Sequence, residues 1–179
     1  MSVGRRERFE TLYRSHGATV RAFVRRRMGA SETDDVVSEV FLIAWRRLDD
    51  VPADPLPWLL GVARRVVANA RRSQARSISL HERLGQEGSA REEAADVPVE
   101  RDPRVLRALA SLGEGDQEVL LLVAWDELRR EQAAKVLGVS AGAFAVRLYR
   151  ARRRFARALA AEDGLESRVD ERPLVSEAL

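Results

Sequence analysis

The sequence predicts an all-α protein, with two small helical domains joined by a flexible linker and a helix-turn-helix in the second domain. Apolar residues recur at intervals of three and four along most of the chain, which indicates amphipathic helices. No segment alternates convincingly between apolar and polar residues, so a β-sheet is not expected. The helical pattern fades near the middle of the 179 residues, and this length is enough for two small domains.

The first domain is expected over residues 5–73. It begins with a helix whose apolar positions, from Phe9 to Val24, share one face. Gly17 interrupts that pattern and is expected to bend or split the helix. A second helix is expected to start near Ser31, where Ser-Glu-Thr-Asp matches a capping box.

The second and third helices each have a clear apolar stripe. In the second helix the stripe consists of Val36, Val37, Val40, Phe41, Ala44, Trp45 and Leu48. A proline-rich turn over residues 51–57 ends this helix and starts the third. In the third helix the core-facing positions are Leu59, Val62, Ala63, Val66, Val67 and Ala70. A different face carries Arg65, Asn69 and Arg72.

The rest of the chain divides into a linker, a second domain and a tail. Residues 74–103 are expected to form a flexible linker, because their central part is polar and acidic and has no aromatic residue. The second domain is expected over 104–161 and includes a short helix at 130–137 and a long one at 141–161. The acidic tail, 162–179, is expected to be disordered.

The composition excludes several kinds of chemistry. The absence of cysteine excludes a disulfide scaffold, a thiolate zinc site and a cysteine nucleophile, and it fits a reducing cytoplasm. With two histidines and no converging carboxylates, we expect no metal, no cofactor and no enzyme activity. No apolar run approaches the roughly 18–20 residues that cross a bilayer, so membrane insertion is not expected.

The net charge of +3 conceals strongly polarised segments. Residues 1–30 hold eight arginines and two acidic residues, whereas residues 31–57 hold two arginines and seven acidic residues. Residues 58–80 hold five arginines and no acidic residue, and residues 129–157 hold nine basic residues and one acidic residue. Such asymmetry indicates more than one charged partner surface. The first basic block has no partner assigned from the sequence.

Residues 132–148 have the spacing of a helix-turn-helix. Ala134 is small enough for two helices to cross closely, Gly138 permits the tight turn, and Phe144 fills the angle between the helices. The second helix of such a motif enters the major groove of DNA. A plain helical hairpin with a solvated arginine face is the alternative. The basic block 129–157 favours DNA, because an exposed helix usually mixes charges of both signs.

Trp58, at the start of the third helix, has two interpretations. Its ring could stack on an unpaired base while Arg64, Arg65, Asn69, Arg71 and Arg72 hold the neighbouring phosphates. It could instead be a core anchor beside the proline turn, which is the better interpretation of this residue taken alone.

The acidic residues of the second helix also have two interpretations. Asp34, Asp35 and Glu39 form either an ordinary solvated face or a surface that binds a basic partner. Their sequence positions do not decide between the two.

Together these segments resemble the extracytoplasmic-function (ECF) sigma factors, the minimal two-domain bacterial transcription initiation factors. The stretch Asp34-Asp-Val-Val-Ser-Glu-Val-Phe-Leu-Ile-Ala-Trp is similar to the region-two helix that docks on the polymerase clamp coiled coil. The stretch Trp58-Leu-Leu-Gly-Val-Ala-Arg-Arg-Val-Val-Ala-Asn-Ala-Arg-Arg is similar to the segment that melts and reads the minus-ten element. Leu137-Gly-Val-Ser and Arg147-Leu-Tyr-Arg-Ala-Arg-Arg-Arg are similar to region four, which reads the minus-thirty-five element and touches the polymerase flap.

The resemblance implies three groups of site residues. The core-polymerase-binding group is Asp34, Asp35, Ser38, Glu39, Phe41 and Trp45. The group that binds minus-ten DNA is Trp58, Arg64, Arg65, Asn69 and Arg72. The group that binds minus-thirty-five DNA is Ser140, Ala143, Arg147, Arg150 and Arg154. The chain departs from the family pattern at several positions. Ser38 replaces a glutamine, Arg65 and Asn69 replace an Asn and an Asp, and Leu112-Gly113 replaces Leu-Pro. Arg129 replaces a helix-capping Ser or Thr, and Ala143 and Ala145 replace a polar residue and a Lys.

The implied function is that of an initiation factor that binds core RNA polymerase and directs it to promoter DNA. An anti-sigma factor is a further partner compatible with the resemblance. The competing interpretation is a stand-alone helix-turn-helix regulator that binds duplex DNA without polymerase. That interpretation explains the basic block 129–157 but leaves the Trp58 segment and the acidic second helix without a role.

Overall fold

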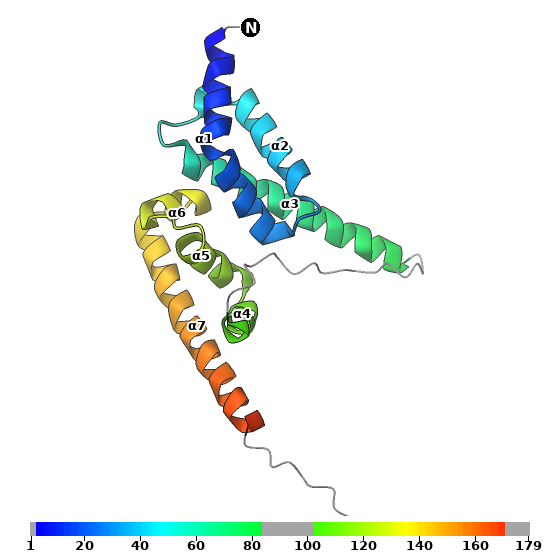
Figure 1. The fold of residues 1–179 in the computed structure, drawn as a ribbon, viewed down its shortest axis with the longest axis vertical. Coiled ribbons are helices and arrows are strands. Elements are labelled where there is room, and N and C mark those ends of the chain that lie inside the picture. Colours follow the sequence, from blue (N-terminus) through cyan, green and yellow to red (C-terminus); the bar gives the residue numbers. More distant parts are fainter. Residues whose placement is uncertain (1–2, 84–101, 171–179) are drawn as a thin grey trace, which may run out of the picture. The chain divides into compact units, whose positions relative to one another are not determined.

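A computed structural model describes residues 3–83 and 102–170, and every element in these ranges is helical (Figure 1). In chain order the elements are α1 (Val3–Met28), α2 (Thr33–Arg46), η1 (Leu48–Asp50), α3 (Pro55–Arg83), α4 (Pro103–Ala110), α5 (Glu114–Ala124), α6 (Arg130–Leu137) and α7 (Ala141–Asp170). They form two compact units, one containing α1 to α3 and the other containing α4, α5, the start of α6 and α7. The predicted all-α fold with two helical domains is confirmed.

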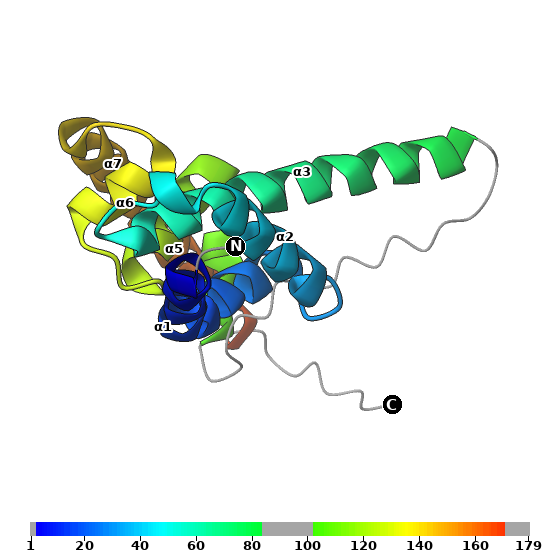
Figure 2. The ribbon, with the colours of Figure 1, turned by 90° about the horizontal axis from the view of Figure 1, so that it is seen from above.

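The core of the first unit lies where α1, α2 and α3 meet, and each of these helices contacts the other two. Each supplies side chains with no exposed surface, namely Val20, Phe23, Val24, Val40, Ala44, Leu59 and Ala63. Because these positions are three or four residues apart within each helix, a single face of each helix is buried. The last turns of α3 extend past α1 and α2 (Figure 2).

The predicted split of the helix at Gly17 is wrong, because α1 is one helix from Val3 to Met28. A glycine inside a helix costs only about 1 kcal/mol relative to alanine. The buried residues on the C-terminal side of Gly17, Val20 to Val24, pack in the common core and offset that cost. The ring of Tyr13 lies over the glycine, 3.7 Å from the place that a Cβ atom would take.

The predicted capping box at Ser31 is also not how α2 begins. The helix starts at Thr33, and its N-cap is Glu32, which makes no side-chain capping bond. The hydroxyl of Thr33 is buried and donates to the carbonyl of Gly29 at 2.5 Å. Gly29 has φ +80°, a conformation that suits glycine, and its N–H donates to Arg25 O at 3.0 Å to end α1. The chain therefore turns tightly between the helices, and Thr33 stabilises that turn.

Two helices continue past the ends of the domains that were predicted from the sequence. Helix α3 continues to Arg83, ten residues beyond the predicted end at 73, and α7 continues to Asp170 beyond 161. Residues 74–83 contain neither glycine nor proline, so nothing in the sequence stops α3 there. The rest of the predicted linker and tail, residues 84–101 and 171–179, lies outside the described residues.

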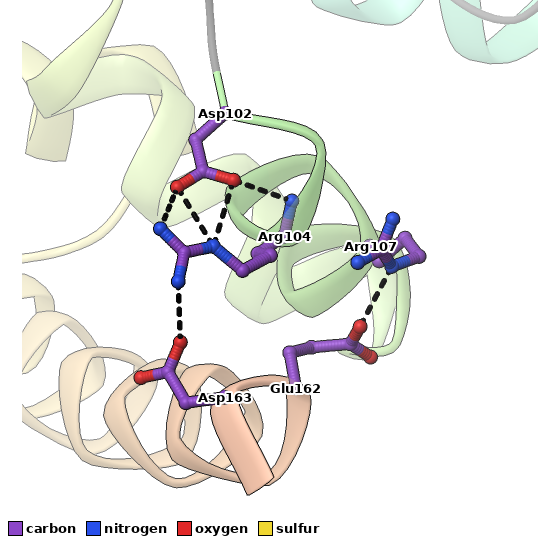
Figure 3. A network of polar contacts seen from close by, with 5 residues as sticks. All are labelled: Asp102, Arg104, Arg107, Glu162 and Asp163. Carbon is purple, nitrogen blue, oxygen red and sulfur yellow. Dashed lines mark hydrogen bonds and ion pairs between the residues drawn. The ribbon is translucent and has the colours of Figure 1, made fainter. Parts of the chain in front are cut away.

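In the second unit, α4 and α5 pack against α7. The core residues of these three helices are Ala108, Leu109, Val119, Leu120, Leu122, Phe144, Leu148 and Ala151. Beyond that core, charged residues connect the two ends of the unit (Figure 3). Arg104 donates to Asp163 at 3.1 Å and Arg107 donates to Glu162 at 2.7 Å, so the start of α4 is held to the C-terminal part of α7.

Asp102 is the N-cap of α4. Its carboxylate accepts the backbone N–H of Arg104 at 2.9 Å and also accepts hydrogen bonds from the Arg104 guanidinium. The side-chain hydrogen bond from Arg104 and, after it, the backbone bond lower the pKa of Asp102 to about 2. The carboxylate also lies next to the positive end of the helix, which favours its charged form.

Candidate nucleic-acid interfaces

The outward face of α2 is acidic with one apolar residue. Asp35, Ser38 and Glu39 are all exposed, and Leu42 follows them on the same face with 46% of its surface exposed. The spacing of three, four and seven residues from Asp35 places the four side chains in one row. Neither Asp35 nor Glu39 makes an ion pair with another described residue. This row, the α2 face, therefore offers two carboxylates followed by a leucine.

The other three residues of the predicted polymerase-binding group are engaged inside the unit. Asp34 forms an ion pair with Arg21 of α1. Phe41 is buried, and its ring lies 4.7 Å from the ring of Tyr13 in an edge-to-face arrangement. The ring of Trp45 lies 5.2 Å from that of Phe9. Aromatic pairs of this kind stabilise the contact between α1 and α2. Phe41 and Trp45 therefore hold α2 in place on the side that faces α1.

Helix α3 exposes a basic stripe. Arg65, Asn69 and Arg72 are exposed and lie on one face, as the sequence predicted, and Arg72 donates to Asn69 Oδ1 at 2.5 Å. Arg76 is also exposed, and four residues after Arg72 it continues the same face, although the sequence analysis did not include it. Arg64, the residue before Arg65, is also exposed and lies beside this row.

Trp58 precedes this basic stripe on the same side of α3 and is half-buried. The guanidinium of Arg47, from the end of α2, lies 5.8 Å from the centre of its ring. Arg47 in turn donates to Asp50 of η1 at 3.0 Å. The ring is therefore neither fully in the core nor fully exposed, and it has a cationic, planar neighbour that can also contact a nucleotide.

The helix-turn-helix geometry agrees with the sequence spacing. Gly138 has φ +67°, the left-handed conformation that the turn requires, and Phe144 is fully buried. Ser140 caps α7, because its Oγ accepts the backbone N–H of Ala143 at 3.1 Å. Where Arg129 replaces a capping Ser or Thr, Gln132 Oε1 accepts the N–H of Arg129 at 3.2 Å and protects the start of α6.

The outward face of α7 carries both basic and apolar residues. Arg147 and Arg150 are exposed, as predicted for residues that contact DNA. Val146 and Tyr149, which the sequence analysis did not assign, are 50% and 62% exposed on the side opposite the buried Phe144 and Leu148. Arg154 instead donates to Asp116 of α5 at 2.6 Å, so this predicted DNA contact already has a partner within the unit.

The N-terminal basic block has partners within its own unit. Arg5 Nη1 donates to Asp49 of η1 at 2.8 Å, and Arg21 pairs with Asp34 of α2. Two arginines of the basic segment 1–30 are thus matched with two carboxylates of the acidic segment 31–57. The charge that the sequence left unassigned is used in part for internal pairing.

A basic recognition helix after a tight turn, together with a separate unit that has an acidic and a basic helix, defines a two-domain DNA-binding transcription factor. Residues 12–77 match the family model of sigma-70 region 2, and residues 103–155 match that of sigma-70 region 4. The chain belongs to the ECF-type sigma-70 family of RNA polymerase sigma factors. It is thus a non-catalytic subunit that gives RNA polymerase its promoter recognition, which decides against the stand-alone regulator.

Several curated proteins are similar in sequence. RNA polymerase sigma factor NccH of Alcaligenes xylosoxydans xylosoxydans is 30% identical over 156 residues, covering 80% of this chain and 82% of NccH. RNA polymerase sigma factor CnrH of Cupriavidus metallidurans is 32% identical over 173 residues, covering 89% of this chain and 90% of CnrH. The probable RNA polymerase sigma factor RfaY of Xanthomonas campestris pv. campestris is 33% identical over 139 residues, but the match spans only 34% of RfaY.

Several solved structures are similar in fold. CnrH in complex with the cytosolic domain of CnrY matches with a TM-score of 0.56 and 27% identity, covering 86% of this chain and 88% of that chain. The sigma factor RpoE in complex with the anti-sigma factor NepR from Bartonella quintana matches with a TM-score of 0.63 and 21% identity, covering 85% of this chain and 96% of that chain.

Within residues 3–83 and 102–170, none of the helices has an apolar stretch long enough to span a lipid bilayer.

Proposed function

We propose that the α2 face binds the clamp coiled coil of core polymerase and that the basic stripe of α3, with Trp58, holds unpaired minus-ten bases. In the second unit, Arg147 and Arg150 of α7 contact the duplex of the minus-thirty-five element, and the same unit touches the polymerase flap. Each of these roles requires binding energy only, because the chemistry of RNA synthesis belongs to the polymerase.

The observation that supports this proposal most directly is the opposite charge of two exposed faces in one small unit. Helix α2 presents Asp35 and Glu39, whereas α3 presents Arg65, Arg72 and Arg76. A surface with two separate charge signs suits two partners of opposite charge, a basic protein surface and a nucleic acid. The asymmetry also steers each partner to its own face during association.

The polymerase contact is tested by removing the carboxylates of the α2 face. For Asp35→Ala/Glu39→Ala we expect core polymerase to bind about tenfold or more weakly, because two charge contacts at an interface are lost. Glu7→Ala is a matched control, since it removes an exposed carboxylate of α1 outside the α2 face. The measurement is the dissociation constant for core polymerase; equal constants for the double variant and the control would contradict the assignment.

The minus-ten contact is tested with a promoter obtained by run-off transcription of genomic fragments with core polymerase. A fragment of this promoter, with its minus-ten segment held open by mismatches, is titrated with holoenzyme. For Trp58→Ala we expect a loss of about 1–3 kcal/mol in binding, the usual value of one stacked base. Arg14→Ala, an exposed arginine of α1, serves as a control. Wild-type affinity of the Trp58→Ala holoenzyme would rule out base stacking by this ring.

An anti-sigma factor is a second partner that we propose for the α2 face. The support is that the solved CnrH structure is a complex with the cytosolic domain of CnrY, and CnrH shares 32% identity with this chain. A protein that covers Asp35, Glu39 and Leu42 would exclude polymerase from this face. A cognate anti-sigma factor should therefore compete with core polymerase, and it should lose affinity for Asp35→Ala/Glu39→Ala. Simultaneous binding of both proteins would contradict a shared face.

A further inference from the structure

The first turns of α1 precede the part of the chain that matches the sigma-70 region 2 model, which begins at residue 12. They nevertheless make specific contacts with the connection between α2 and α3. Arg5 and Arg8 reach across to residues more than 39 positions later in the chain. Phe9, in the same turns, packs its ring against those of Phe41 and Trp45.

Arg5 makes three contacts, two with Trp45 at the end of α2 and one with Asp49 of η1. Its Nη2 donates to Trp45 O at 3.0 Å, its Nη1 donates to the carboxylate of Asp49 at 2.8 Å, and its guanidinium lies 5.5 Å from the centre of the Trp45 ring. The carbonyls of the last helical turn have no amide partner within the helix, and they carry partial negative charge. A guanidinium is well suited to this place, since its planar fork of donors can reach two acceptors together.

Arg8, three residues later on the same face of α1, donates to Val51 O at 3.3 Å. Val51 is the residue that follows η1, where its N–H donates to Leu48 O at 3.4 Å. The two arginines therefore hold both ends of η1. Arg5 binds the end of α2, just before η1, and Arg8 binds Val51, just after it. A single surface ion pair contributes little to stability, but here two side chains converge on backbone carbonyls around one short segment.

The segment held in this way carries the neighbour of Trp58. Arg47 is the N-cap of η1, its Nε donates to Asp50, and its guanidinium lies over the Trp58 ring. A continuous series of contacts thus runs from Arg5 through Asp49 and η1 to Arg47 and Trp58.

We propose that Arg5 and Arg8 are positioning residues for promoter opening: they fix the α2–α3 connection, and with it Arg47 and the Trp58 ring, in the arrangement that accepts unpaired minus-ten bases. The inference rests on the proposed function of Trp58. The α2–α3 connection is then already ordered in the folded protein, so DNA binding does not have to provide the free energy of ordering it.

The test compares Arg5→Ala/Arg8→Ala with Arg6→Ala in the full-length chain. Arg6 is a matched control, because it lies between the two in the same turns and its ion pair is with Glu10 of its own helix. Each variant is assembled with core polymerase, and two dissociation constants are measured: one for core polymerase and one for the promoter fragment with the pre-opened minus-ten segment.

For the double variant we expect no loss of affinity for core polymerase and about tenfold weaker binding to the pre-opened fragment, as the loss of one or two charge-assisted hydrogen bonds implies. Arg6→Ala should match the wild type in both. When Arg5→Ala/Arg8→Ala is combined with Trp58→Ala, the triple variant should bind the fragment no more weakly than Trp58→Ala alone, because all three act through one ring.

Two results would overturn the inference while leaving the proposed function intact: wild-type binding of the fragment by the double variant, or a defect that adds fully to that of Trp58→Ala. A parallel loss of polymerase affinity would also overturn it, since it would show a general structural role. If Trp58→Ala itself binds the fragment like the wild type, the proposed function fails, and the inference fails with it.

Discussion

Tyr149 is a large side chain that stays exposed on the recognition helix, with the guanidinium of Arg153 5.8 Å from the centre of its ring. In the major groove, apolar side chains contact the methyl group of thymine. We therefore expect Tyr149→Ala to weaken binding of the minus-thirty-five duplex by about 1 kcal/mol and to flatten the base preference at one position. Thermal unfolding should not change, because the ring is mostly exposed. Uniformly weaker binding to all duplexes would instead indicate a phosphate contact.

Single residues show where sequence reasoning reached the site and where it did not. Phe144 and Gly138 were predicted correctly, because a tight turn and an interhelical angle each require one kind of residue. Leu42 was missed, although its position outside the apolar stripe of the second helix indicates that it faces outward. Two ion pairs were missed, that of Asp34 with Arg21 and that of Arg154 with Asp116. In each pair the two residues are far apart in the sequence.

At the scale of the element, the N-cap of α4 makes stability depend on pH. The pKa of Asp102 falls from 3.8 to about 2 on folding, so the folded state favours the ionised carboxylate. The stabilisation is therefore complete above the unfolded pKa and is lost as the pH falls through the folded pKa. We expect wild type to be more stable than Asp102→Asn at pH 5, and this difference to shrink between about pH 4 and pH 2.

Chemical denaturation at a series of pH values, followed by circular dichroism, measures this difference. Asn is a good N-cap and keeps the capping hydrogen bond, so the comparison isolates the charge. A control with Asp163→Asn, whose carboxylate accepts from the same Arg104, removes a charge at the other end of the network. A stability difference between wild type and Asp102→Asn that stays constant from pH 5 to pH 2 would contradict the role of the carboxylate.

The existence of most helices was predictable from the sequence, whereas their ends were less so. The stripe of α2 and the spacing of the helix-turn-helix come from the local requirement to bury one face. The C-terminal part of α7, in contrast, has lost its apolar periodicity, and its acidic residues Glu162 and Asp163 are matched by Arg107 and Arg104 of α4. Only the tertiary structure brings these four charges together, so a pattern of apolar residues could not have found this contact.

At the scale of the whole molecule, two units with separate cores can fail separately. Phe144 is fully buried in the second unit, and its replacement by alanine is expected to cost about 3–5 kcal/mol, much of the stability of so small a domain. We expect Phe144→Ala to bind core polymerase through the α2 face, more weakly because the flap contact is lost. It should keep binding single-stranded minus-ten DNA and lose its dependence on the minus-thirty-five element. The measurement is transcription from promoters with and without that element. Complete loss of binding both to polymerase and to single-stranded minus-ten DNA would show that the first unit depends on the second.

The pairing of α1 with its neighbours has a consequence for chimaeras made between sigma factors. Arg21 and Arg5 neutralise Asp34 and Asp49, so only part of the acidity around α2 is available to a partner. A graft of residues 31–57 into another scaffold would separate these carboxylates from their guanidiniums. The transplanted surface would then be more negative than the native one, and it would attract basic proteins indiscriminately. Exchange of α1, α2 and η1 together preserves the native balance of charge.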